Sequence, residues 1–267
     1  MIHCSKIYHF ESRNSHMASA IKLVVTDMDG TIVATKQHTT SEAVRSAVIG
    51  VEQSGVQVAA VTARPYEFAK SVFTVLGIDG LCVVDGGATV VQSTTGEVVW
   101  SKWLDADALK KIVAIMLPHT QTIDYKVGWN EESAVDVDIE MITDAAPYVY
   151  AEVDVGDVAG IFARLNRIDG VIGHAITQDD PSVIGIQVCH YQADKFHGVS
   201  ALRDIVGLTK DQTLAIGDGD NDLSLFQNAA VKVAMGNATD KLKSQADYIV
   251  GSLADDGFAE AMQRFVL

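Results

Sequence analysis

Short apolar runs alternate with helical patterns over the first third of the chain. Residues 21–26 form a β-branched run that stops at Asp-Met-Asp-Gly, which indicates a buried parallel strand with polar residues at its carboxyl end. Further strands are predicted at 56–61 and 81–84, with helices that begin near Ser41 and Pro65. Proline suits the first turn of a helix because its φ angle is already helical. This alternation predicts a parallel, doubly wound sheet.

The pattern changes after about residue 88. Paired strand patterns and two helical patterns follow, and together they are typical of a small α+β domain. The α/β pattern then returns, with a helix near residue 197 and three more strands. We therefore predict an α/β fold. Its doubly wound parallel (Rossmann-like) core comprises 20–85 and 190–267, and an α+β domain is inserted at 86–189.

Residues 1–19 differ from the rest of the chain. They lack apolar periodicity and hold three of the eight His. His16-Met17-Ala18-Ser19 resembles a cloning-site sequence, and no apolar segment suits a secretory signal. We interpret this leader as vector-derived or disordered and exclude it from functional reasoning.

The charge balance limits the partners of the chain. Lys and Arg number 20 against 35 Asp and Glu, a formal net charge of −15, which repels nucleic acid and anionic lipid. No run approaches the roughly 18 apolar residues that span a bilayer. Cys4, Cys82 and Cys189 are far apart and odd in number, so they indicate reduced thiols. We expect a soluble, cytoplasmic protein that binds neither nucleic acid nor membrane, with its oligomeric state left open.

Polar residues follow the predicted parallel strands at their carboxyl ends, where open α/β sheets bind ligands. Asp-Gly pairs alone more often mark turns, but here several carboxylates meet at one sheet edge. The candidates are Asp27, Asp29, Gly30 and Thr31 after the first strand, Thr62 and Arg64 after the second, Lys195 ahead of a later helix, and Asp218, Asp220, Asn221 and Asp222 after the strand at 213–216.

The chemistry of these residues indicates a metal. Carboxylates gathered at buried strand ends repel one another unless a cation compensates their charge. Oxygen ligands with no His or Cys nearby favour a hard cation, and Mg²⁺ is the natural choice beside a phosphate. A bound cation would also explain how an acidic protein accepts an anionic substrate.

At this point a family resemblance is evident. Asp27-Met28-Asp29-Gly30-Thr31, Thr62, Lys195 and the run from Gly217 to Asp222 resemble the four ordered motifs of the haloacid dehalogenase-like (HAD) phosphatases. The placement of the insert resembles the Cof-type branch with an α+β cap, subclass IIB, and the resemblance covers essentially all of 20–267. The chain departs from the usual pattern at Ala63, where the family often has Gly, and at Phe196, where Gly usually follows the lysine.

The resemblance implies a role for each motif residue. Asp27 would be the nucleophile that forms a phospho-aspartyl intermediate, and Asp29 would act as general acid and then general base. Four residues are implied as Mg²⁺ ligands: Asp27, Asp29 through its carbonyl, Asp218, and Asp222 directly or through water. Those implied to bind the substrate phosphate are Met28, Thr62, Ala63 and Lys195, with Asn221 and Arg64 in supporting positions.

The predicted function is hydrolysis of a small phosphate monoester, such as a sugar phosphate, phosphoglycolate or a related metabolite. A phosphomutase of the same fold and a catalytically silent phosphometabolite-binding domain stay as alternatives. The retained set Asp27, Asp29, Lys195 and Asp218 argues against the silent domain. Loops of the insert near 125–132 and 179–182 are expected to select the substrate.

Overall fold

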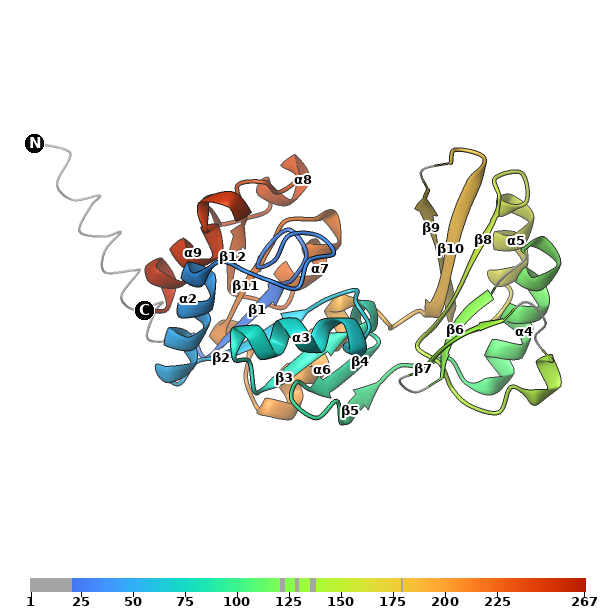
Figure 1. Cartoon of the computed structure of the whole chain (residues 1–267), viewed down its shortest axis with the longest axis horizontal. Coiled ribbons are helices and arrows are strands. Elements are labelled where there is room, and N and C mark those ends of the chain that lie inside the picture. The colour runs from blue at the N-terminus through green and yellow to red at the C-terminus, as the bar shows by residue number, and fades with distance from the viewer. Residues whose placement is uncertain (1–20, 121–122, 128–129, 135–137, 179) are drawn as a thin grey trace, which may run out of the picture. The chain divides into compact units, whose positions relative to one another are not determined.

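The computed structural model describes residues 21–120, 123–127, 130–134, 138–178 and 180–267 (Figure 1). The predicted leader therefore lies outside the described residues. The chain forms two compact units. The core unit comprises the described residues up to Val99 together with Lys195–Leu267, and the inserted unit comprises Trp100–Asp194. No helix in the described ranges is long and apolar enough to cross a membrane.

The core unit is built on an eight-stranded sheet of order β13-β12-β11-β1-β2-β3-β4-β5. The central strand β1 pairs in parallel with both β2 and β11. The strands are β1 (Leu23–Asp27), β2 (Gln57–Val61), β3 (Leu81–Val84), β4 (Thr89–Gln92), β5 (Val98–Ser101), β11 (Thr213–Gly217), β12 (Val231–Ala234) and β13 (Tyr248–Ile249). Every residue of β1 and β11 is buried, as expected for parallel strands covered on both faces.

The strand order reverses beside β1. The chain moves outward from β1 to β3 in one direction and from β11 to β13 in the other, so right-handed crossovers place their helices on opposite faces. Helix α2 contacts α3 and α9, whereas α6 contacts α7 and packs on β3 and β4. The helices are α2 (Glu42–Gln53), α3 (Tyr66–Leu76), α6 (Lys195–Val206), α7 (Leu223–Phe226), α8 (Asp240–Lys243) and α9 (Gly257–Phe265). The predicted doubly wound fold is confirmed.

The inserted unit has a sheet of its own. Its five strands have the order β7-β6-β8-β10-β9. Strand β8 pairs antiparallel with β6 and β10, and β10 pairs antiparallel with β9. Its strands are β6 (Ile123–Val127), β7 (Asn130–Ala134), β8 (Tyr148–Asp154), β9 (Val171–Thr177) and β10 (Val183–His190), with helices α4 (Ala106–Met116) and α5 (Val158–Leu165). Residues such as Ile112, Val149 and Ile186 form its core. The insert is thus an α+β domain.

The boundaries of the insert differ from those predicted. Strands β4 and β5, which the sequence assigned to the insert at 86–189, extend the core sheet instead, and β4 pairs antiparallel with β3. Val90 and Val91 are fully buried, because this hairpin covers the edge that β3 would otherwise expose. The change of pattern near residue 88 therefore marks a change of strand direction within one sheet, and the boundary between the two units falls within β5, between Val99 and Trp100.

Close packing of α6 against the core sheet depends on Gly198. A Cβ at this position would lie 2.6 Å from Val83 Cγ1 and 2.8 Å from the carbonyl oxygen of Gly87. Because α6 begins at Lys195, this contact also determines where that lysine stands relative to the carboxyl ends of the strands.

Replacement of Gly198 by alanine should therefore destabilise the core. We expect Gly198→Ala to lower the free energy of unfolding by about 1–3 kcal/mol, the usual cost of overpacking. Gly160, a helical glycine of α5 with no atom within 4 Å of its added Cβ, is the matched control, and Gly160→Ala should gain up to about 1 kcal/mol from helix propensity. Urea unfolding of both variants tests this, and equal changes would contradict the packing argument.

Candidate active site

The candidate site lies at the carboxyl ends of β1 and β11, where the strand order reverses. Asp27 is the last residue of β1, and Asp218 directly follows β11. The parallel register pairs Thr26 with Ile216, so the two strands end side by side. A reversal point of this kind leaves a crevice between the helices that leave in opposite directions.

Three carboxylates meet at this edge. Asp27, Asp218 and Asp222 each offer an oxygen, and these oxygens lie within 4.8 Å of one another. Asp222 is fully buried, and its Oδ2 accepts hydrogen bonds of 2.9 Å from the amides of Asp218 and Gly219. Thr31 donates its hydroxyl to Asp218 Oδ1 at 2.9 Å. These bonds hold the carboxylates in place despite their mutual repulsion.

Lys195 faces two of these carboxylates. Its Nζ lies 2.5 Å from Asp27 Oδ1 and 2.7 Å from Asp222 Oδ1, and only 4% of its surface is exposed. One lysine does not neutralise three acidic groups, so the cluster keeps an excess of negative charge. Oxygen donors alone at such a site are the ligand type of a hard divalent cation.

The electrostatics of the cluster follow from burial. Desolvation raises the pKa of Asp27 to about 7, with Lys195 opposing the shift and the charges of Asp222 and Asp218 adding to it. Desolvation, together with Asp222, also raises the pKa of Asp218. For Lys195, burial acts to lower the pKa, but Asp27 and Asp222 outweigh burial and the net shift is upward. Lys195 is therefore a permanent cation here.

Asp29 has a different environment, although it lies only two residues from Asp27. Arg64 binds its carboxylate with two hydrogen bonds, Nε to Oδ2 at 2.8 Å and Nη2 to Oδ1 at 2.7 Å. The Lys36 amide donates a third, of 3.0 Å, to Oδ1. Burial acts to raise the pKa of Asp29, but these hydrogen bonds outweigh it and lower the pKa. The side chain of Asp29 thus stands apart from the three-carboxylate cluster.

The remaining sequence candidates lie at the same edge with varied exposure. Thr62 follows β2 and is buried, and its Oγ1 accepts a 3.0 Å hydrogen bond from the Arg64 amide. Met28 is buried, whereas Ala63 and Asn221 are exposed. The phosphate-binding and supporting roles implied for these residues stay predictions.

Asp220 turns away from the cluster. Its Oδ1 accepts a 2.7 Å hydrogen bond from Thr239, and its Oδ2 lies 3.3 Å from Lys241 Nζ at the surface. It was a strand-end candidate because it lies within the same short sequence run as Asp218 and Asp222. The 3₁₀ turn η5 (Asp220–Asp222) separates their side chains.

Two features of the site had no assigned role from the sequence. Gly30 has a φ of +86°, and a Cβ there would collide with the Asp218 carboxylate, so only glycine allows this approach. Asn237 Nδ2 donates to the Gly30 carbonyl at 2.9 Å and lies 3.4 Å from Asp218 Oδ2. Asn237 belongs to Gly236-Asn237-Ala238, a run that forms part of the family resemblance without an assigned role, and it follows β12, which ends at Ala234.

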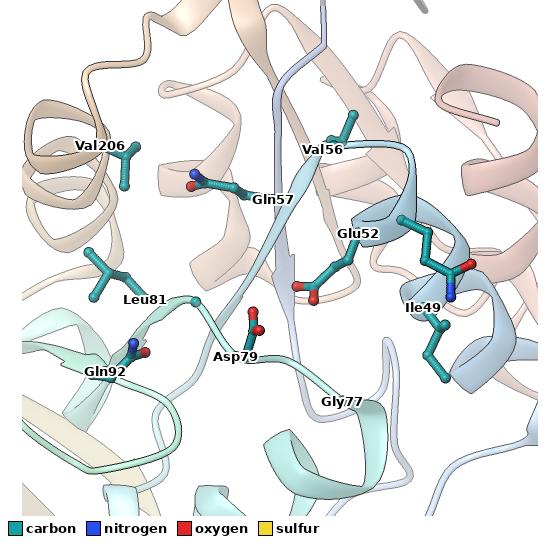
Figure 2. A pocket seen from close by; sticks show the side chains of 12 residues that line it. Ile49, Glu52, Val56, Gln57, Gly77, Asp79, Leu81, Gln92 and Val206 are labelled. Carbon is teal, nitrogen blue, oxygen red and sulfur yellow. The ribbon is translucent and has the colours of Figure 1, made fainter.

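A separate cavity lies at the opposite edge of the sheet. The cavity has a volume of about 530 Å³. Figure 2 shows its lining, which includes Glu52 from the end of α2 and Gln57, Asp79 and Leu81 at or beside the amino ends of β2 and β3. It contains none of the clustered carboxylates. Its position at the amino ends of the strands, away from the reversal point, argues against a role in the chemistry of the candidate site.

Comparison with known proteins gives the family. The profile of the haloacid dehalogenase-like hydrolases matches residues 24–146 and 128–262, and the chain belongs to this family. Phosphoglycolate phosphatase 1 of Saccharolobus solfataricus is 27% identical over 250 residues, which cover 92% of this chain and 96% of that protein. The 5-amino-6-(5-phospho-D-ribitylamino)uracil phosphatase YcsE of Bacillus subtilis is 27% identical over 251 residues, with the same coverage.

Solved structures agree on the fold. The chain matches the HAD subclass IIB sugar phosphatase BT4131 with a TM-score of 0.72 and 19% identity, over 91% of this chain and 98% of that one. The profile match confirms the family predicted from the motifs, and the phosphatase relatives confirm the prediction of a HAD-like phosphatase enzyme.

The raised pKa of Asp27 predicts that the free energy of unfolding of the metal-free protein falls as the pH rises. Because that pKa is about 7 in the folded chain and 3.8 ordinarily, ionisation of Asp27 withdraws stability as the pH rises through this window. Asp27→Asn cannot ionise, so at pH 8 it should exceed the wild type in free energy of unfolding by up to about 4 kcal/mol, because the two pKa values differ by roughly three units at about 1.36 kcal/mol each.

Urea unfolding in chelator at pH 8 and pH 4 measures this difference. We expect the advantage of Asp27→Asn to shrink toward zero at pH 4, where the wild-type carboxyl is also neutral. A wild type that is the more stable protein at pH 8 would show that Lys195 compensates the buried charge fully.

Proposed function

We propose that this HAD-like phosphatase hydrolyses a small phosphate monoester through a phospho-aspartyl intermediate on Asp27, with Mg²⁺ at the carboxylate cluster. The observation that carries the proposal is the meeting of Asp27, Asp218 and Asp222 with the buried Lys195. The fold itself does not require three acidic groups to lie together, and the negative charge that Lys195 leaves uncompensated would be balanced by a bound cation.

The donor set suits the proposed metal. The oxygens of Asp27, Asp218 and Asp222 are close enough to share one ion, with the Asp29 carbonyl as a further ligand and Asp222 acting directly or through water. Mg²⁺ prefers oxygen ligands and keeps waters and substrate phosphate in its coordination sphere. When bound, it would neutralise charge on the phosphoryl group and so favour attack by a carboxylate.

The chain's own residues divide the chemistry. Asp27 attacks phosphorus, the ester bond breaks, and the leaving oxygen takes a proton from Asp29. Lys195 stays protonated and stabilises charge on the transferring group. Thr62 and the amides near Met28 and Ala63 would hold the phosphoryl oxygens.

Hydrolysis of the intermediate reverses the role of Asp29. The carboxylate accepts a proton from water, which attacks the aspartyl phosphate and releases inorganic phosphate. The lowered pKa that Arg64 imposes on Asp29 keeps the carboxylate ionised, as a base requires. The acid step needs the protonated form, so Asp29 must take up a proton in the substrate complex.

The substrate class follows from the relatives. Both named relatives are phosphatases and align over nearly their whole length. This supports transfer of the phosphoryl group to water over the mutase reaction, in which the phosphoryl group is transferred back to the substrate. We propose a sugar phosphate, phosphoglycolate or a similar metabolite, and the charge of −15 supports the absence of nucleic acid among the partners. Of the predicted selecting loops, 128–129 and 179 lie outside the described residues, and the cap role of the insert stays a proposal.

Activity should depend on Mg²⁺. Phosphate release from a panel of phosphorylated metabolites should vanish in chelator and return with Mg²⁺. Ca²⁺ should restore little, because its higher coordination number lets Asp27 bind through both oxygens and leave the line of attack.

Variants locate the ion. Mg²⁺ should raise the melting temperature of the wild type and do so less for Asp218→Asn, whereas Asp220→Asn, whose carboxylate faces Thr239, should respond as the wild type does. Full activity in chelator, or an equal loss of the Mg²⁺ effect in both variants, would refute the assigned metal site.

Substitution of the two aspartates of the first motif, Asp27 and Asp29, should block different steps of the reaction. Asp27→Asn removes the nucleophile, so phosphoenzyme and turnover should both fall to background. Asp29→Asn keeps the nucleophile and loses proton transfer, which is typically worth about 10²–10⁴-fold. With a nitrophenyl phosphate, whose leaving group needs no proton, phosphorylation should partly recover while hydrolysis still lags. Rapid-quench mass spectrometry should then find phosphate accumulating on Asp27 of Asp29→Asn, and phosphate on another residue would overturn these roles.

A further inference from the structure

Arg64 and Asp29 form a bidentate ion pair. Both guanidinium bonds are short, at 2.8 and 2.7 Å, and use both carboxylate oxygens. The side chains are 12% exposed for Arg64 and 29% for Asp29, so the pair is partly shielded from water. Two-point contact between a planar guanidinium and a carboxylate fixes orientation as well as distance.

The backbone of Arg64 is itself held from two sides. Its amide donates to Thr62 Oγ1 at 3.0 Å, and its carbonyl accepts a 3.1 Å hydrogen bond from the amide of Asp85. Asp85 is a buried residue with a φ of +54°, a conformation that is uncommon outside glycine. The ends of β2 and β3 therefore present Arg64 from a rigid base.

The loop after Asp29 supplies the third contact from a second strained residue. Lys36 has a φ of +62°, and its amide donates to Asp29 Oδ1 at 3.0 Å. A non-glycine residue in the left-handed region costs of order 1 kcal/mol or more. Such a cost persists where the surroundings demand that conformation, and here it directs the amide toward the carboxylate.

From these contacts we propose that Arg64 is a positioning residue that orients Asp29. Arg64 holds the Asp29 carboxylate next to the cluster of Asp27, Asp218 and Asp222 and prevents it from joining that cluster. The inference rests on the proposed function. Asp29 lies two residues from Asp27, so an unrestrained carboxylate could turn toward a cation at the cluster. Arg64 competes for both oxygens, which leaves the Asp29 side chain free of the cluster and oriented for proton transfer.

The consequence is selective. Removing Arg64 should harm only the steps in which Asp29 moves a proton, because the contacts of Asp27, Asp218 and Lys195 do not involve it. An alkyl phosphate needs protonation of its leaving oxygen, whereas a nitrophenyl phosphate does not. The ratio of phosphorylation rates on these two substrates therefore separates positioning of Asp29 from general damage or from direct binding of phosphate by Arg64.

Rapid-quench kinetics with a double-mutant cycle tests the proposal. Arg64→Ala should slow phosphorylation by an alkyl phosphate about 10- to 100-fold through misorientation, and change phosphorylation by nitrophenyl phosphate by less than about threefold. Arg64→Lys should recover part of the loss, since one ammonium replaces a planar fork. In an Asp29→Asn background, Arg64→Ala should add less than about threefold, as expected for residues that act through one another.

Controls and a second readout keep the outcomes distinct. Arg45 pairs with Glu42 on the exposed face of α2, and Arg45→Ala should leave both rates unchanged. Equal losses on both substrates, or full additivity in the cycle, would overturn the proposal and indicate that Arg64 contacts phosphate itself. A wild type inactive on every phosphomonoester would refute the proposed function instead. The pairing is then judged by the Arg64 Nε–H resonance, which should be protected from exchange in the wild type and lose protection in Asp29→Asn.

Discussion

The structure depends on three carboxylates held together at one end of a parallel sheet. Carboxylate oxygens of Asp27, Asp218 and Asp222 lie within 4.8 Å of one another. The folded protein tolerates their mutual repulsion because other parts of the chain compensate the negative charge. Lys195 supplies the cation, and the amides of Asp218 and Gly219 bind Asp222. The adjacency of β1 and β11 and the close approach of α6 are both needed to bring these groups together.

The same edge gives two neighbouring aspartates opposite properties. Burial raises the pKa of Asp27, whereas hydrogen bonds from Arg64 and Lys36 lower that of Asp29. The difference suits a nucleophile that is activated beside a cation and a carboxylate that exchanges protons. Pairs of acidic groups whose surroundings move their pKa values apart are a common sign of divided roles in catalysis.

The architecture keeps the cluster independent of the insert. All three of its carboxylates and Lys195 belong to the core unit, whereas the insert has its own sheet and its own apolar core. The insert is therefore available to vary without disturbing the residues proposed for phosphoryl transfer. The β4–β5 hairpin, which extends the core sheet, was misassigned because antiparallel pairing has the same local pattern in a core sheet as in a separate one.

The sequence by itself determined the strands, the doubly wound order and the residues at the strand ends, because apolar periodicity and the ends of buried strands are local properties. For that reason it predicted Asp27, Asp218, Asp222 and Lys195 at one sheet edge. It also predicted Asp29 and Asp220 there, whose carboxylates have other partners in the structure. Only the tertiary structure decided that Arg64 clamps Asp29, that Asn237 reaches the Gly30 carbonyl and that Asp220 turns outward. These depend on rotamers and loop conformations set by contacts between distant segments, which no local pattern of residues encodes.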